Sequence, residues 1–373
     1  MPLSLFCDAL PYSELHANYE GWLDDMQVAP LLPNIAYSSS LHWQLYCDKY
    51  PDERGVLVDW TRAPEGSRAV RVAATLLRPL DAIPWLGWFS RKVLDRVVFR
   101  RNAFANVPYK FRKDFSDKGQ YLFWKSSVYR KEEIFDGYAV ISQDEGHLSF
   151  DCVMEKLNAC IASGEKNIFG VLGFADSMGH TCRRGEEYSA RLKKYMDVLR
   201  ESIKKYLEMN PDESVLIVSD HGMSTVEHRV DVGLEKKFGR QTKKSYIAYS
   251  DSAIMCVWSD RPELLRGIAE HLGGIEYGHL LTDEEREYYR ATDKKFGDLI
   301  FILREGYVFE KNWFGISARK PSADGSGMHG FWPEKEAKDQ IASIVTVNGS
   351  EKLGEYYDYS EAHRLIRKVM KGD

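Results

Sequence analysis

The chain has 373 residues, of which 44% are hydrophobic and 13% aromatic, and it carries a net charge of -5 at pH 7. This composition is typical of a globular protein with material for one large domain or two smaller ones, and it excludes a disordered or fibrous chain. The acidic balance argues against a role that depends on a basic nucleic-acid-binding surface, so we expect no nucleic-acid partner.

The hydropathy pattern shows no sign of membrane insertion or export. No run of about 18 apolar residues is present, and the N-terminal sequence MPLSLFCDAL lacks the charged region and the long apolar region of a secretory signal. The six cysteines include no Cys-x-x-Cys pair, which is typical of reduced thiols. We therefore expect a cytoplasmic protein.

Three apolar runs end on an aspartate, at Leu3–Asp8, Asn167–Asp176 and Leu216–Asp220. Continuous apolar runs fit strands that are buried on both faces of a parallel sheet, where ligands collect at the carboxyl ends of the strands. Apolar residues recur at helical spacing from Glu187 to Leu207, which predicts a strand–helix–strand crossover. The segment SSSLHWQLY, which starts at Ser38, predicts a helix with a serine N-cap.

Histidines accompany these aspartates in three short motifs. His180 follows Asp176 at the fourth position, His221 follows Asp220 directly, and His329 lies in GSGMHGF. With Asp8, these residues give six candidate ligands, enough for two ions with three protein ligands each and open positions. Mixed imidazole and carboxylate ligands favour zinc, or manganese and related ions, over magnesium and calcium. For any single Asp–His pair, a helix cap or a surface ion pair is the alternative interpretation.

Four motifs in this order, FCDALPYSEL, GFADSMGHT, VSDHGMS and MHGFW, resemble the metal motifs of the alkaline phosphatase superfamily. They are most similar to its type I phosphodiesterase and nucleotide pyrophosphatase branch, and Gly297–Phe309 resembles that branch as well. The resemblance covers residues 1–60 and 145–335. It implies an α/β fold with a doubly wound, mostly parallel sheet flanked by helices, two divalent ions and a serine or threonine nucleophile that forms a phospho-enzyme.

The resemblance also assigns residues to roles. It implies one ion held by Asp176, His180 and His329, and a second held by Asp8, Asp220 and His221 together with the nucleophile. Counting back without gaps from YPDERG places the nucleophile at Ser38, with Ser39 and Ser40 as alternatives. Coordination to a divalent ion makes a serine alkoxide accessible at neutral pH. The helix N-terminus predicted there would direct backbone N–H groups at the phosphate.

Further candidate substrate contacts are His42, Arg54 and Asp59. Arg54 replaces the histidine that is usual in the family, and Asp59 falls near an asparagine that contacts phosphate in the nucleotide-cleaving relatives. Because an acid there would repel a nucleotide phosphate, this departure argues against nucleotide substrates.

The region between the two matching parts has no counterpart in the resemblance. We therefore predict a catalytic core of residues 1–60 and 141–373 and an inserted cap region of residues 61–140. Insertions of this kind often carry specificity. The apolar and basic sequence is interpreted as a helical cap packed on the core, and peripheral membrane contact through residues 69–113 is the second interpretation. The candidate phosphate contacts in this region are Arg78, Arg91, Lys92, Arg100 and Arg101.

The sequence thus predicts a two-metal phosphodiesterase or related phosphoryl hydrolase, with a small-molecule, glycan or lipid phosphoester as substrate. One alternative is a phosphotransferase that passes a phospho-alcohol group to a glycan or lipid acceptor. The other is a catalytically silent relative that uses the fold for binding.

Overall fold

The computed structural model describes residues 2–19, 21–64, 66–99, 107–116, 126–142, 149–314, 326–334, 337–349 and 352–372. The chain forms two compact units. The first unit contains Met1–Tyr50, Tyr121–Glu227 and Ser322–Asp373, and the second contains Pro51–Gln120 and His228–Pro321. These bounds differ from the predicted core and inserted region, because residues 228–321 fold together with residues 51–120 rather than with the core.

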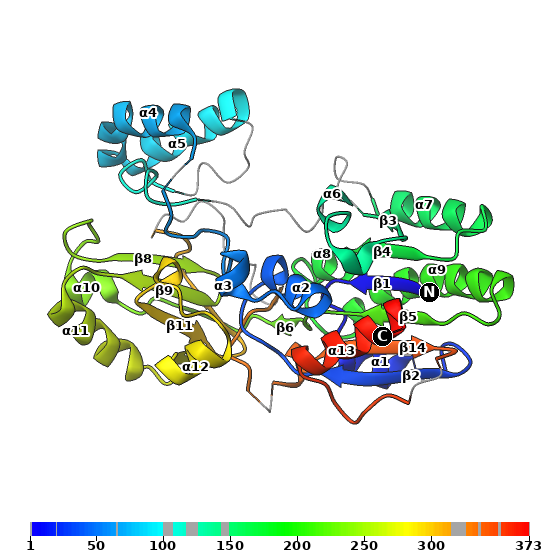
Figure 1. Ribbon diagram of the computed structural model, residues 1–373. Coiled ribbons are helices and arrows are strands. Elements are labelled where there is room, and N and C mark those ends of the chain that lie inside the picture. Colours follow the sequence, from blue (N-terminus) through cyan, green and yellow to red (C-terminus); the bar gives the residue numbers. More distant parts are fainter. Residues whose placement is uncertain are drawn as a thin grey trace. The chain divides into compact units, whose positions relative to one another are not determined.

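The first unit is built on a six-stranded sheet (Figure 1). Its strand order is β2 (Met26–Leu31), β14 (Ala342–Val347), β5 (Val215–Val218), β1 (Leu3–Cys7), β4 (Ile168–Leu172) and β3 (Ala139–Ile141). The central strand β1 pairs in parallel with β4 and β5, whereas β14 is antiparallel to both β5 and β2. Every residue of β1, β4 and β5 is buried. The predicted doubly wound, mostly parallel sheet is therefore confirmed.

Helices cover both faces of this sheet. On one face, α1 (Tyr12–Asn18), α7 (Phe150–Ala162) and α9 (Glu186–Met209) share an apolar core with residues such as Leu5. On the other face, Phe6 packs edge-on against His42 and Tyr46 of α2 (Ser38–Cys47). Helix α13 (Tyr359–Lys371) packs beside α2. The side chains of the neighbouring residues Leu5 and Phe6 thus point to opposite faces of the sheet, as the alternation of side chains along a strand requires.

The predicted crossover helix is present as α9, which connects β4 to β5 by way of the short helix α8 (Phe174–Gly179). Its buried side includes Leu192, Met196, Leu199 and Ile203, the residues that the helical spacing predicted. The first unit also contains α6 (Ser126–Tyr129) and a two-stranded antiparallel pair of β6 (Ser224–Thr225) and β13 (Gly327–Met328).

The second unit has its own antiparallel sheet, in the order β10 (Gly278–Leu280), β11 (Leu299–Leu303), β9 (Ile254–Trp258) and β8 (Ile247–Asp251). A short parallel pair joins β7 (His228–Val230) to β12 (Tyr307–Phe309). Its helices are α3 (Pro51–Arg54), α4 (Arg68–Leu76), α5 (Pro84–Leu94), α10 (Leu234–Phe238), α11 (Pro262–Gly273) and α12 (Asp283–Tyr288). The predicted inserted region is thus largely helical where the structure describes it, whereas Arg100 and Arg101 lie outside the described residues.

All six cysteines are free, in agreement with the prediction of reduced thiols. Across the described ranges, each helix is either too short or too polar to cross a lipid bilayer.

We expect Leu199→Ala to lower the free energy of unfolding by about 2–5 kcal/mol, because the side chain is fully buried between α9 and the sheet. Val198 is the next residue on the same helix and is 43% exposed, so Val198→Ala should change stability by less than about 0.5 kcal/mol. Urea denaturation of the two variants measures the difference. Equal destabilisation would contradict the assigned buried face of α9.

Candidate metal centre

The predicted ligands gather where the central strands of the first unit end. Asp8 directly follows β1, and Asp220 lies two residues beyond β5. Because these strands run in parallel, their carboxyl ends meet at one edge of the sheet.

The position of Asp176 differs from the prediction. Strand β4 ends at Leu172, and Asp176 lies inside α8, for which Gly173 is the N-cap. The helical turn places Asp176 and His180 four residues apart on one face, with His180 Nε2 3.0 Å from Asp176 Oδ1. The helix, rather than the end of the strand, therefore sets the geometry of this pair.

One group of potential ligands consists of Asp176, His180 and His329, whose ligand atoms all lie within 4.8 Å of one another. His329 Nε2 is 3.5 Å from Asp176 Oδ1. His329 directly follows β13, whose partner β6 begins at Ser224, three residues after His221. This short strand pair brings the late histidine to the DHG segment.

The second group consists of Asp8, Asp176 and His221, again within 4.8 Å of one another. His221 Nε2 lies 3.3 Å from Asp8 Oδ1 and 3.4 Å from Asp220 Oδ2. The imidazole rings of His221 and His329 stack with their centroids 3.7 Å apart. The six predicted ligands therefore form one continuous cluster, in which Asp176 belongs to both groups rather than to one.

Ser38 is the first residue of α2 and contacts this cluster. Its Oγ is 2.9 Å from His221 Nε2 and 3.2 Å from Asp8 Oδ1. The predicted serine N-cap is wrong, because the N-cap residue is Tyr37 and its side chain makes no cap hydrogen bond. The Ser38 hydroxyl contacts the candidate ligands instead of capping the helix. The Ser40 hydroxyl accepts a hydrogen bond from Gln44 at 3.4 Å. Of the three predicted serines, Ser38 is thus the one whose hydroxyl contacts the candidate ligands, and its role as nucleophile stays a prediction.

The carboxylates in the cluster are held in an environment that opposes their charge. Asp8 and Asp220 are 1% and 0% exposed. Burial, followed by the negative charges of Asp220 and Asp176, raises the pKa of Asp8 well above its usual value. Burial also raises the pKa of Asp220. Burial therefore opposes the charged form of both carboxyl groups.

The histidines respond in opposite directions. Burial alone would lower the pKa of His221, but the carboxylates of Asp220 and Asp8 raise it to about 10. Burial, together with the positive charge of the stacked His221, lowers the pKa of His329 well below its usual value. Burial opposes the charge on Asp176, but His180 holds the pKa of Asp176 below its usual value. His221 thus holds a proton at neutral pH that a divalent ion would replace.

The residues present fit divalent ions of the zinc or manganese type. Within the described part of the chain, the ion-pair partners of Asp8, Asp176 and Asp220 are all histidines, with no lysine or arginine among them. The buried carboxylate oxygens of Asp220 and the buried Nδ1 of His329 have no hydrogen-bond partner of normal geometry among the described residues. Buried charges of this kind are costly without a compensating cation, and this mixture of nitrogen and oxygen ligands suits transition ions.

Three residues outside the predicted ligand set hold the DHG segment in place. The Ser219 hydroxyl accepts a hydrogen bond from the backbone of Leu10 at 2.8 Å and donates to the carbonyl of His221 at 2.9 Å. Tyr359 of α13 donates its hydroxyl to the carbonyl of Asp220. A β-carbon on Gly222 would overlap the backbone carbonyl of Asp339. Ser219 and Gly222 lie within the motif itself and could have been found there, whereas nothing local in the sequence points to Tyr359.

The predicted substrate contacts are placed as follows. His42 is fully buried, with its ring packed on Phe6, Trp43 and Tyr129, so contact with a substrate would require the ring to leave this core. Arg54 and Asp59 are half-buried residues of the second unit, and their roles stay predictions.

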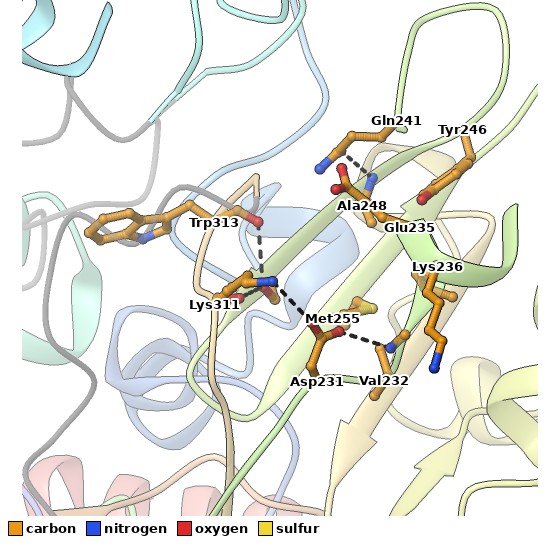
Figure 2. Close-up of a pocket in the computed structure, with 13 residues that line it drawn as sticks. Asp231, Val232, Glu235, Lys236, Gln241, Tyr246, Ala248, Met255, Lys311 and Trp313 are labelled. Carbon is orange, nitrogen blue, oxygen red and sulfur yellow. Dashed lines mark hydrogen bonds and ion pairs between the residues drawn. The ribbon is translucent and has the colours of Figure 1, made fainter. Parts of the chain in front are cut away.

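A separate pocket of about 430 Å³ lies within the second unit (Figure 2). Its wall includes the apolar side chains of Met255 and Trp313, and Lys311 Nζ pairs with Asp231 Oδ2 at 3.1 Å along one side. No residue of the metal cluster lines it. The metal cluster, by contrast, combines potential ligands with the hydroxyl of Ser38.

Comparisons with known proteins find similarity in structure alone. No family model and no curated protein matches the sequence. Murine ectonucleotide pyrophosphatase/phosphodiesterase 5 matches with a TM-score of 0.60 at 10% identity, over 99% of this chain and 95% of that chain. An inactive variant of the murine protein in complex with AMP gives the same values. The human protein matches with a TM-score of 0.60 at 12% identity and the same coverage. These matches show that the chain has the alkaline phosphatase-like fold of the nucleotide pyrophosphatase/phosphodiesterase structures.

Proposed function

We propose that the first unit is a metal-dependent phosphodiesterase, or a related phosphoryl hydrolase, with Ser38 as its nucleophile. The observation that carries this proposal is the position of the Ser38 hydroxyl, 2.9 Å from His221 and 3.2 Å from Asp8, at the edge of a cluster of buried carboxylates and histidines. The structural likeness to ectonucleotide pyrophosphatase/phosphodiesterase 5 supports the same reaction class.

Two divalent ions would be held by this cluster, with zinc as the proposed metal. Asp176, His180 and His329 would hold one ion, and Asp8, Asp220 and His221 would hold the other. When bound, such ions act as Lewis acids that stabilise negative charge on the attacking oxygen and on the leaving oxygen.

The protein's own contribution is to position and orient the reacting groups. Ser38 Oγ attacks phosphorus in line with the leaving group, so that the Oγ–P bond forms while the bond from phosphorus to the alcohol oxygen breaks. The hydroxyl proton passes to solvent, and the leaving alcohol takes a proton from solvent. Water then cleaves the Oγ–P bond and restores the serine. Because α2 begins at Ser38, the positive end of its dipole favours the phosphate bound there.

The proposed substrate is a phosphodiester of a small molecule, a glycan or a lipid. The murine protein was solved in complex with AMP, which is a finding on that protein. The proposed location is cytoplasmic.

The proposal is tested by hydrolysis of bis-p-nitrophenyl phosphate. We expect Ser38→Ala to lower kcat by about three orders of magnitude or more, because the attacking oxygen is lost. Ser39→Ala removes the hydroxyl of the adjacent residue and should leave kcat within about threefold of the wild type. Elemental analysis should find equal metal contents in the two variants.

Two outcomes would contradict the proposal. Cleavage that survives in Ser38→Ala but is lost in Ser39→Ala would assign the nucleophile to Ser39 instead of Ser38. A chain that binds no ion and cleaves no ester would support the silent relative. Addition of sugar or lipid alcohols to the wild-type reaction separates hydrolysis from transfer, because a transferase forms a new diester in place of free phosphate ester.

Metal binding is expected to compete with protons. The pKa of His221 is raised to about 10 in the metal-free cluster, so this group is protonated at neutral pH, whereas a metal ligand must be the neutral imidazole. Zinc binding should therefore release at least one proton, and the affinity should fall by about tenfold for each unit of pH lowered below neutrality. Isothermal titration calorimetry in two buffers of different ionisation enthalpy measures the number of protons released.

Two comparisons make this experiment specific. His363 lies outside the cluster and contacts the carbonyl of Leu45, so His363→Gln should release the same number of protons as the wild type. Asp220→Asn should weaken zinc binding, because it removes a carboxylate ligand without changing the side-chain size. A heat of binding that does not depend on the buffer would contradict the assignment of these residues as ligands.

A further inference from the structure

A second surface of the molecule has features that the catalytic proposal does not explain. The segment Arg68–Val98 contains α4, the 3₁₀ turn η1 (Arg78–Ala82), α5 and the start of the π-helical turn η2 (Asp95–Phe99). We name it the docking segment. Of the thirteen large hydrophobic side chains that are exposed among the described residues, eight belong to it: Val72, Leu76, Ile83, Trp85, Phe89, Val93, Val97 and Val98.

These apolar side chains are arranged in a stripe. Trp85, Phe89, Val93 and Val97 recur at intervals of four residues and are 69%, 55%, 43% and 70% exposed. Residues three and four apart share one face of a helix, so the stripe runs along the outer side of α5 and continues into η2. Val72 and Leu76 form a similar pair on α4, at 50% and 71% exposed.

The inner side of α5 carries a buried ion pair, next to Leu94, which packs against a small apolar cluster. Arg91 is 1% exposed, and its Nη1 is 2.7 Å from Asp81 Oδ1. The guanidinium also lies over the ring of Tyr109, with its carbon 5.4 Å from the ring centroid. Asp81 accepts a further hydrogen bond from the backbone of Lys110 at 2.8 Å. A surface helix in water normally places its large apolar residues inside, whereas two of the largest ones of α5, Trp85 and Phe89, are exposed.

Charge on the docking segment favours an anionic partner. It carries six cationic side chains against two acidic ones, although the whole chain is acidic. The two acids are directed inward, since Asp81 pairs with Arg91 and Asp95 is buried. The exposed charged side chains of the segment are therefore all arginines: Arg68, Arg71, Arg78 and Arg96.

We propose that the docking segment binds the surface of an anionic lipid membrane, with Trp85 and Phe89 inserted among the head groups and the arginines paired with lipid phosphates. Tryptophan and phenylalanine favour the interface between water and hydrocarbon, and arginine is attracted by anionic lipids. The helices lie on the membrane and do not cross it. This proposal does not depend on the reaction that the metal cluster performs.

The test is sedimentation of the full-length protein with lipid vesicles. The wild type should bind vesicles made of equal parts of phosphatidylcholine and phosphatidylglycerol, and added salt should weaken this binding. Vesicles of phosphatidylcholine alone should bind it at least about tenfold more weakly. The double variant Trp85→Ser and Phe89→Ser should lose at least about tenfold in partitioning to the anionic vesicles.

A matched control replaces two exposed aromatic residues elsewhere, Tyr288 and Tyr356, which are 72% and 56% exposed. The variant Tyr288→Ser and Tyr356→Ser should bind as the wild type does. Since all four side chains are exposed, circular dichroism melting should show that both double variants stay folded. A wild type that binds neither vesicle, or a docking variant that binds like the control, would overturn the proposal. A wild-type dimer without lipid that the docking variant makes monomeric would assign the surface to a second copy of the chain.

Discussion

The first unit depends on the burial of three carboxylates at one edge of its sheet. Asp8 and Asp220 meet there because parallel strands deliver their carboxyl ends to the same place, and α8, which follows β4, adds Asp176. The ion-pair partners of the three carboxylates among the described residues are histidines. Such a cluster opposes folding when it is fully charged. Protons offset the charge in one state and divalent ions would offset it in the other. The occupancy of the cluster therefore sets both the charge state of the site and its contribution to stability.

The surrounding structure is organised to hold these groups rigidly. Gly222 packs directly on the backbone of Asp339, and the side chain of Asp339 is bound by Arg184 at 3.0 Å. Arg184 also donates to Ser13 at 3.0 Å and lies over the ring of Tyr188 at the start of α9. The loop that carries His221 is thus connected to α1 and α9 on one face, while Tyr359 of α13 holds Asp220 from the other. Rigid support of this kind is what ligand geometry requires.

The sequence predicted those parts of the site whose signal is local. Asp8 and Asp220 follow apolar strands closely, so their meeting could be inferred from strand direction. Asp176 was assigned to the end of a strand because the apolar run continues through Phe174 and Ala175, and a short helix with the same composition cannot be distinguished from a strand by periodicity. The contact of Tyr359 with Asp220 joins residues far apart in the chain and leaves no local pattern. The division into two units was missed for the same reason, since residues 51–120 and 228–321 meet only in the folded chain.

The second unit shows how a buried polar contact can leave an apolar face exposed to water. In α5, Gly87 permits the close approach of Asp81 and Arg91, since a side chain at this position would contact both. The ion pair and the ring of Tyr109 then fix the side of the helix that carries Arg91 inward. Once that side is fixed, the helical repeat places Trp85, Phe89 and Val93 outward. The exposure of the apolar stripe is therefore linked to the buried Arg91–Asp81 contact, and the proposed lipid surface would supply the apolar environment that water does not.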